Sequence, residues 1–120
     1  MAAKDSRLEV REEDGITWIS FLDRNILDEA NIQQIGDEIT AVVERSGNPL
    51  ILINFDRVEH LSSAALGTLI TINNRVRQKG GQLRLSNIDP QIYEVFVITK
   101  LNKLFQIHDN NEAALASFQK

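Results

Sequence analysis

The feature that most restricts the fold is a short apolar run, LILINF, at residues 50–55. Asn54 is the one polar residue in the run, and Gly47, Asn48 and Pro49 precede it. A continuous apolar run of this length next to turn residues is typical of a strand that is covered on both faces. We therefore predict a central strand of an α/β sheet at these residues, because helices cover both faces of such a sheet.

Amphipathic helices are predicted on either side of this strand in the chain. Residues 28–46 carry apolar side chains three, four and seven positions apart, with Asp28 as the expected N-cap. Residues 62–79 carry a second apolar stripe, and Gly80-Gly81 follows it. A glycine supplies the left-handed residue that commonly ends a helix, so we expect the second helix to end there.

The remaining segments continue this alternation of strands and helices. Residues 7–12 and 16–21 alternate polar and apolar side chains around Asp14-Gly15, which predicts a hairpin. Further along, the chain predicts a strand at 82–86, a helix opened by Asp89-Pro90 and ended by Asn102, a strand at 105–108, and a last helix that runs from a capping box, DNNE, to Phe118.

These elements give the order β-β-α-β-α-β-α-β-α. The β-α-β crossovers are expected to be right-handed, so the predicted fold class is α/β, with a mixed, mostly parallel central sheet of about five strands and four helices. At 120 residues the chain is long enough for one hydrophobic core, which typically spans about 100 to 150 residues. We expect a single domain over residues 1–120.

Composition and charge argue against several classes of function. The formal net charge is −4 and the basic residues are scattered, so we expect no nucleic-acid ligand. The chain contains no cysteine, which excludes disulfides, cysteine-ligated zinc and a thiol nucleophile. The charged N-terminal stretch has no secretory apolar core, and the longest apolar run is too short to span a membrane. We expect a cytoplasmic protein.

Signals for catalysis are weak. His60 and His108 are far apart in the sequence and have no nearby cysteine or histidine partner, so no metal site is predicted. The stretch QKGGQL lacks the ending of a phosphate-binding P-loop, and LSSAALG differs from the G-x-S-x-G nucleophile elbow. We therefore predict that the protein is not an enzyme and carries no cofactor or metal.

Two adjacent serines lie where the second helix begins. If Ser62 is the N-cap, Leu61 and Leu66 have the spacing of a hydrophobic staple around it, and Ser62 accepts a backbone N–H of the first turn. Ser63 is then the first helical residue, and its hydroxyl is left free. Spacing alone leaves two interpretations of Ser63 open. It is either a small polar surface residue or a site where a phosphate would meet the positive end of the helix dipole.

Two long segments, LILINFDRVEHLSSAALGTLI and KGGQLRLSNIDPQIYEVFVITKLNKLF, resemble the STAS family, which is named for sulfate transporters and anti-sigma factor antagonists. The resemblance covers nearly the whole chain. Family members commonly show Asp-Ser-Ser/Thr-Gly-Leu-Gly at this strand-to-helix junction, and a partner anti-sigma kinase phosphorylates the first serine after the aspartate. In this chain Ser62 takes the aspartate place, Ser63 the phospho-acceptor place and Ala65 the glycine place, while Leu66-Gly67 match the pattern.

The resemblance implies an anti-sigma factor antagonist that is regulated by phosphorylation. The unmodified protein would bind an anti-sigma factor that is also a serine kinase. Phosphorylation of Ser63, which is favoured over Ser62 as the acceptor, would release this partner. A phosphatase would then remove the phosphate and reset the cycle. The alternative is a STAS scaffold or sensor subunit that is never phosphorylated, which Ser62 in place of the aspartate favours. Both leave the oligomeric state open.

The expected docking surface is the start of the second helix with its adjoining loops. It comprises two exposed threonines of the helix, the serine pair, and charged or polar residues of the loops, with Asp23 joined by residues 24–26: Asp23, Arg57, Glu59, His60, Ser62, Ser63, Thr68 and Thr71.

Overall fold

A five-stranded sheet forms the centre of the protein. The computed structural model describes residues 6–118. The strand order is β1-β2-β4-β6-β7, and the β1/β2 hairpin is antiparallel whereas the other neighbouring strands run parallel. The strands are β1 (Leu8–Glu13), β2 (Ile16–Phe21), β4 (Leu50–Asn54), β6 (Gln82–Ser86) and β7 (Gln106–His108). The predicted α/β class, the mixed and mostly parallel sheet, and the central place of the LILINF strand are confirmed.

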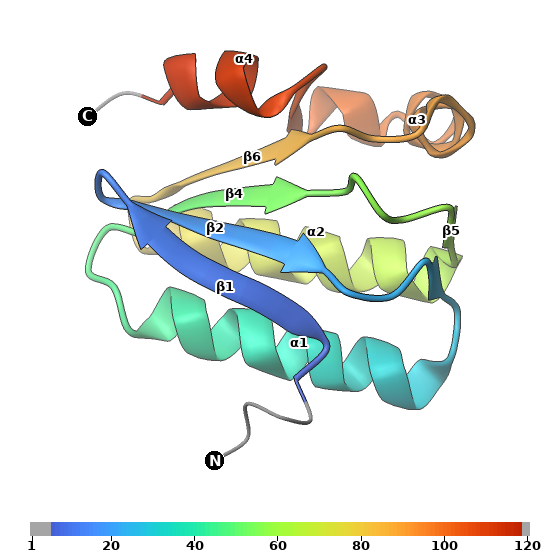
Figure 1. Cartoon of the computed structure of the whole chain (residues 1–120), viewed down its shortest axis with the longest axis horizontal. Helices are drawn as coiled ribbons and strands as arrows, with labels where there is room; N and C mark the ends of the chain where they lie inside the picture. Colours follow the sequence, from blue (N-terminus) through green and yellow to red (C-terminus); the bar gives the residue numbers. More distant parts are fainter. Residues whose placement is uncertain (1–5, 119–120) are drawn as a thin grey trace.

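Helices lie on both faces of this sheet. Figure 1 shows two long helices, α1 (Glu29–Glu44) and α2 (Ser63–Gln78), side by side beneath it. The short helix α4 (Asn111–Ala116) covers part of the opposite face, and α3 (Pro90–Ile98) follows the carboxyl end of β6. A turn of 3-10 helix, η2 (Leu101–Lys103), leads from α3 into β7.

The two faces of β4 show why its sequence is continuously apolar. Ile51 and Ile53 are fully buried in the main core with α1 and α2, whereas Leu52 points to the other face and packs with Ala114 and Phe118 near α4. Because successive side chains of a strand point to opposite faces, a strand covered on both must be apolar at every position. Burial of the strand therefore follows directly from the pattern.

Two strands of two residues each were not predicted. β3 (Asn25–Ile26) and β5 (His60–Leu61) pair in parallel and form a separate small sheet. β3 follows β2 and β5 follows β4, so this ladder ties together the loops that leave two neighbouring strands. Both segments were expected to be loops.

Two predicted helix ends differ from the structure, and one predicted cap has the expected position without a side-chain hydrogen bond. Asp28 stands at the N-cap of α1, but its side chain makes no capping hydrogen bond. α3 ends at Ile98 rather than Asn102, because Lys100 adopts a left-handed conformation with φ of 64°. The cap of α4 is Asn110, whose side chain accepts the Ala113 N–H, and not the first residue of the DNNE box. None of the helices in the described part of the chain is both long and apolar enough to cross a membrane.

Candidate protein-docking site

The start of α2 has the capping geometry that the serine pair predicts. Ser62 has an extended backbone, and its Oγ accepts the Ala65 N–H at 3.2 Å. The Ser62 N–H in turn donates to the Ile26 carbonyl at 3.1 Å, which ties the start of the helix to β3. Leu61 and Leu66 both pack in the main core on either side of this cap. Ser62 is therefore a structural residue, because its hydroxyl oxygen is engaged in the helix cap.

Ser63 has the opposite character. It is the first residue of α2 and is exposed, and its hydroxyl has no hydrogen-bond partner among residues 6–118. The first N–H groups of a helix lack intrahelical acceptors and carry a partial positive charge, so this end of α2 favours an anion. No acidic residue occupies the first turn of α2. The free hydroxyl thus lies at a helix end that carries no negative charge of its own.

The loops around the helix start are held together by several contacts. The Arg24 carbonyl accepts the N–H groups of both Glu59 and His60, at 2.8 and 3.1 Å. The Arg24 guanidinium lies 3.6 Å from the Glu59 carboxylate, and the side chains of His60 and Asn25 meet at 2.7 Å. These exposed residues form a fixed rim beside Ser62 instead of two independent loops.

One apolar side chain belongs to the same rim and was missed. Leu27 directly follows β3 and is 54% exposed. A large aliphatic side chain at this exposure adds apolar contact area to a surface that is otherwise polar, and protein interfaces usually combine the two. The sequence offered no signal for its exposure, because an apolar residue directly before a helix N-cap such as Asp28 commonly packs against the first turns of the helix.

The two threonines of α2 border the same hollow between α1 and α2 but differ in exposure. Thr71 is exposed, as are Ser63 and Gly67, and these three residues follow one another at four-residue spacing along the helix. Thr68 is half-buried, since its Cγ2 lies 3.0 Å from the position that a Cβ on Gly36 of α1 would take. The expectation that Thr68 is exposed is wrong, because α1 approaches α2 closely at this glycine.

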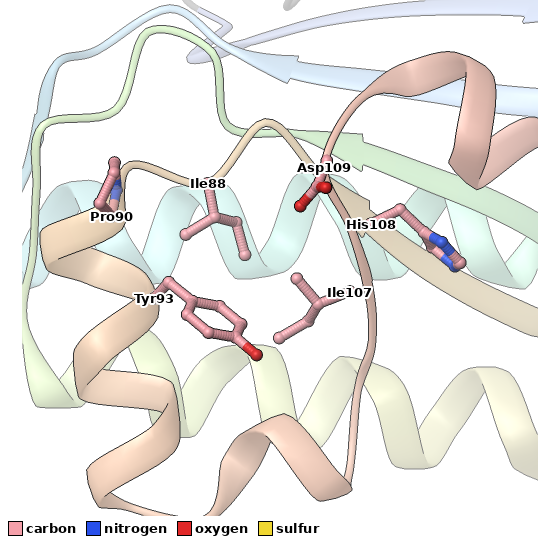
Figure 2. A pocket seen from close by; sticks show the side chains of 6 residues that line it. All are labelled: Ile88, Pro90, Tyr93, Ile107, His108 and Asp109. Carbon is pink, nitrogen blue, oxygen red and sulfur yellow. The ribbon is translucent and has the colours of Figure 1, made fainter.

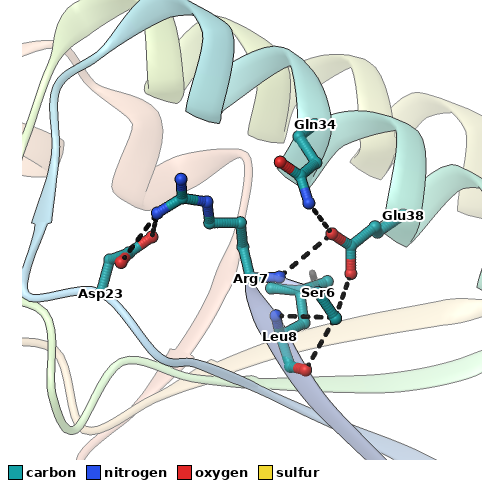
Figure 3. Close-up of polar contacts among 6 residues, drawn as sticks. All are labelled: Ser6, Arg7, Leu8, Asp23, Gln34 and Glu38. Atoms are coloured by element: carbon teal, nitrogen blue, oxygen red, sulfur yellow. Dashed lines mark hydrogen bonds and ion pairs between the residues drawn. The ribbon is translucent and has the colours of Figure 1, made fainter. Parts of the chain in front are cut away.

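Asp23 forms an ion pair with Arg7, the residue that directly precedes β1. Both of its carboxylate oxygens lie 3.2 Å from Nη1 of Arg7, as Figure 3 shows. The backbone N–H of Arg7 donates to Glu38 of α1 at 3.1 Å, so the same residue links the loop after β2 to the underlying helix. Asp23 therefore positions its loop, whereas Arg57 is exposed and has no partner among the described residues.

The basic cluster at the far end of α2 is engaged with α1. Arg75 and Lys79 both pair with the Glu44 carboxylate. The hydrogen bond from Arg75 is the main reason why the pKa of Glu44 lies below its usual value. This cluster joins the carboxyl ends of the two long helices.

A hollow of about 320 Å³ lies at the carboxyl ends of β6 and β7, beside the start of α3. In Figure 2 the imidazole of His108 points away from both the Tyr93 hydroxyl and the Asp109 carboxylate. These polar groups do not converge on one point, as an acid–base pair would require. Nowhere in the described residues do three or more potential metal ligands come together.

The fold and the site define an α/β domain in which one serine caps a helix and the next serine is exposed at the first position of that helix. A family model described as the STAS domain matches residues 7–114, and the chain belongs to this family. The resemblance noted in the sequence is thereby confirmed.

The relatives are named as anti-sigma factor antagonists. The chain is 29% identical to BtrV of Bordetella bronchiseptica, which carries that name, over 96 residues that cover 80% of this chain and 82% of BtrV. A solved anti-sigma-factor antagonist (STAS) domain protein from Planctomyces limnophilus superposes with a TM-score of 0.82 at 25% identity, covering 91% of this chain and 96% of that one. The phosphorylated form of SpoIIAA from Bacillus shares the fold, with a TM-score of 0.67 and 18% identity over 92% of this chain and 99% of that one.

Proposed function

We propose that this protein is an anti-sigma factor antagonist whose binding to its partner is switched off by phosphorylation of Ser63. The proposal rests on the different roles of two adjacent hydroxyls. Ser62 Oγ accepts the Ala65 N–H, whereas Ser63 Oγ is exposed and has no hydrogen-bond partner in the described part of the chain. The partner is a protein that is both anti-sigma factor and serine kinase, and a phosphatase restores the hydroxyl.

The physical basis of the switch is a change of charge on an intact scaffold. A phosphate on Ser63 adds about 1.5 to 2 negative charges at neutral pH. Unpaired N–H groups and the helix dipole stabilise this charge where α2 begins, so the domain keeps its fold. A partner surface fitted to the neutral hydroxyl would have to bury a dianion, which is strongly unfavourable without a compensating cation. Binding is therefore lost while folding is not.

The proposed docking surface consists of the exposed residues around this helix start: Arg57, Glu59, His60, Ser63 and Thr71, together with Leu27. Leu27 supplies apolar area and the charged residues supply orientation and specificity. Ser62 supports the surface through its cap, and Asp23 supports it through its ion pair with Arg7. Thr68 contributes at the side that faces α1.

Phosphorylation is tested with a serine kinase of the anti-sigma type from the same genome. After incubation with the kinase and ATP, intact-mass analysis should show a gain of one phosphate on the wild-type protein. The gain should disappear in Ser63→Ala and persist in Ser62→Ala. No gain with the wild type would favour the alternative of a scaffold or sensor that is not phosphorylated, and a gain that survives Ser63→Ala would remove Ser63 as the acceptor.

Docking is tested separately from phosphorylation. Binding to the same kinase without ATP, measured by calorimetry, should weaken by at least about tenfold in Ser63→Glu and in Leu27→Asp, since each places a carboxylate in the interface. Thermal unfolding should be nearly unchanged in both variants because the two side chains are exposed. Undiminished binding by both would exclude this surface.

A further inference from the structure

A polar row crosses the whole sheet on the face that carries α4. The strand registers place Glu9 opposite Ser20, Ser20 opposite Asn54, Asn54 opposite Ser86, and Ser86 opposite His108. The next row, one residue along and on the other face, is entirely apolar: Val10, Ile19, Ile53, Leu85 and Ile107. The polar row includes the central strand, and Ser86 in it is fully buried. Packing alone would favour apolar side chains at such positions.

A backbone N–H group determines which way the side-chain amides of Asn54, Asn87 and Asn111 are turned, that is, which atom is the oxygen and which the nitrogen. The Asp56 N–H can only donate, and it donates to Asn54 Oδ1 at 3.0 Å. Asn87 must then use its NH₂ group toward the same oxygen, at 2.9 Å, and it also donates to Asn111 Oδ1 at 3.2 Å. The Ser86 hydroxyl donates to that Asn111 oxygen as well, at 2.5 Å. Both acceptor oxygens are therefore already used within the protein.

The groups left over are hydrogen-bond donors. Asn111 Nδ2 has no partner among the residues that the structure describes, and Asn54 Nδ2 reaches only Ser20 Oγ, at 3.4 Å, and keeps a second hydrogen. Both residues line a cleft of about 420 Å³ on this face of the sheet. A cavity of this size lies within the range of about 300 to 1,000 Å³ that is typical of small-molecule sites.

The wall of the cleft formed by β1 and β2 carries opposite charges and an aromatic ring. The Arg11 guanidinium lies 4.5 Å from the centre of the Trp18 ring, and both residues line the cleft. Glu9 lines it too, is exposed, and has no ion-pair partner within residues 6–118. Two strand spacings of about 4.8 Å separate Glu9 from Asn54, so the carboxylate and the amide donors stand at opposite sides of a small-molecule-sized gap.

We propose that this cleft binds a small zwitterion of the amino-acid type. The carboxylate of the ligand accepts hydrogen bonds from the amide groups of Asn54 and Asn111, its ammonium group pairs with Glu9, and its apolar part packs on the Trp18 ring. An acceptor is required because the unpaired amide N–H groups on one side are donors. A cationic group is required because, among the described residues that line the other side, Glu9 has no ion-pair partner, whereas Arg11 pairs with Glu13 at 3.4 Å. The inference does not rest on the phosphorylation of Ser63.

The fluorescence of the protein offers a direct test, since Trp18 is its only tryptophan. Titration with each free L-amino acid, up to about 10 mM and thus well above a dissociation constant of about 1 mM, should reveal at least one that changes the Trp18 emission saturably. The primary amide and the N-acetyl derivative of that amino acid should each bind at least about tenfold more weakly, because each lacks one of the two charges.

Two variants test the two ends of the site. Asn111→Asp keeps the oxygen that accepts from Ser86 and Asn87 but replaces the free donor with an oxygen, so it should abolish the response. Glu9→Gln should weaken it, and Glu12→Gln, an exposed change on the other face of the same strand, should leave it unchanged. Circular dichroism checks that each variant is folded. The proposal is overturned if no amino acid changes the emission, if Asn111→Asp responds like the wild type, or if both blocked derivatives bind as tightly as the free amino acid.

Discussion

The side chains of Asn25 and His60, 35 positions apart in the sequence, meet with 2.7 Å between Oδ1 and Nδ1. The same two residues are paired in the β3/β5 ladder. The loop after β2 and the loop after β4 therefore behave as one unit at the start of α2. This unit includes the hydrogen bond from the Ser62 N–H to Ile26, so it also holds the cap of the helix in place.

Removing this side-chain contact should loosen the rim while leaving the fold intact. In Asn25→Ala and His60→Ala we expect the free energy of unfolding to fall by less than about 1 kcal/mol, because the bond is exposed to water. Amide exchange at Ser62 should nevertheless become faster, since its acceptor lies on β3. Exchange measured by NMR tests this, with Asn74→Ala on the outer side of α2 as the control. Unchanged exchange in both variants would show that the backbone ladder alone holds the loops.

Alanine substitutions of the two serines should have different effects on the free energy of unfolding. Ser62→Ala removes the acceptor of the Ala65 N–H and should cost about 1 kcal/mol in the free energy of unfolding. Ser63→Ala should change it by less than about 0.5 kcal/mol, because the exposed hydroxyl has no partner in the described structure. Urea denaturation of the two variants provides the comparison. A larger loss for Ser63→Ala than for Ser62→Ala would mean that the capping register is wrong.

The sequence correctly predicted the elements that are determined by residues close together in the chain. The apolar run of β4, the stripe of α2 and the Ser62 cap each depend on residues within a few positions of one another. The β3/β5 ladder was missed because a two-residue strand shows no periodicity and is held by backbone pairing with a distant segment.

Other misses depended on neighbouring elements. Asp109 and Asn110 both belong to residue types that cap helices well. β7 ends at His108, and the cap of α4 is Asn110, the second residue after the strand. The burial of Thr68 depends on Gly36 of another helix, which no pattern within α2 indicates. The polar row became visible only when the strand registers were known, because its members come from five separate segments.

A close backbone approach at the start of β6 should make one glycine sensitive to substitution. A Cβ on Gly81 would lie 2.2 Å from the Pro49 carbonyl oxygen, whereas a Cβ on Gly47 would have no heavy atom within 4 Å. Gly81→Ala must therefore displace backbone that also accepts the Gln82 N–H, and we expect a loss of about 1 to 3 kcal/mol. Gly47→Ala should change stability by less than about 0.5 kcal/mol. Equal urea midpoints for the two variants would contradict the close approach.

His108, the last member of the polar row, is held in an environment that disfavours its charged form. Its Nε2 is buried and has no hydrogen-bond partner in the described part of the chain. Burial lowers the pKa of His108 below its usual value, and the positive charge of Arg84 lowers it further, while Asp109 acts in the opposite direction. Arg84 itself is buried, and its hydrogen-bond partners among the described residues are neutral.

The lowered pKa of His108 should make folding stability depend on pH in the range where histidine titrates. Because the unfolded chain binds a proton at His108 near pH 6.5 and the folded protein resists it, the stabilisation is present above about pH 6.5 and is lost as the pH falls below that value. Urea unfolding at about pH 7.5 and 5.5 avoids the titration of Glu44, whose pKa lies lower still. His108→Gln should flatten the difference between the two pH values. A difference that persists undiminished in His108→Gln would have to come from other groups.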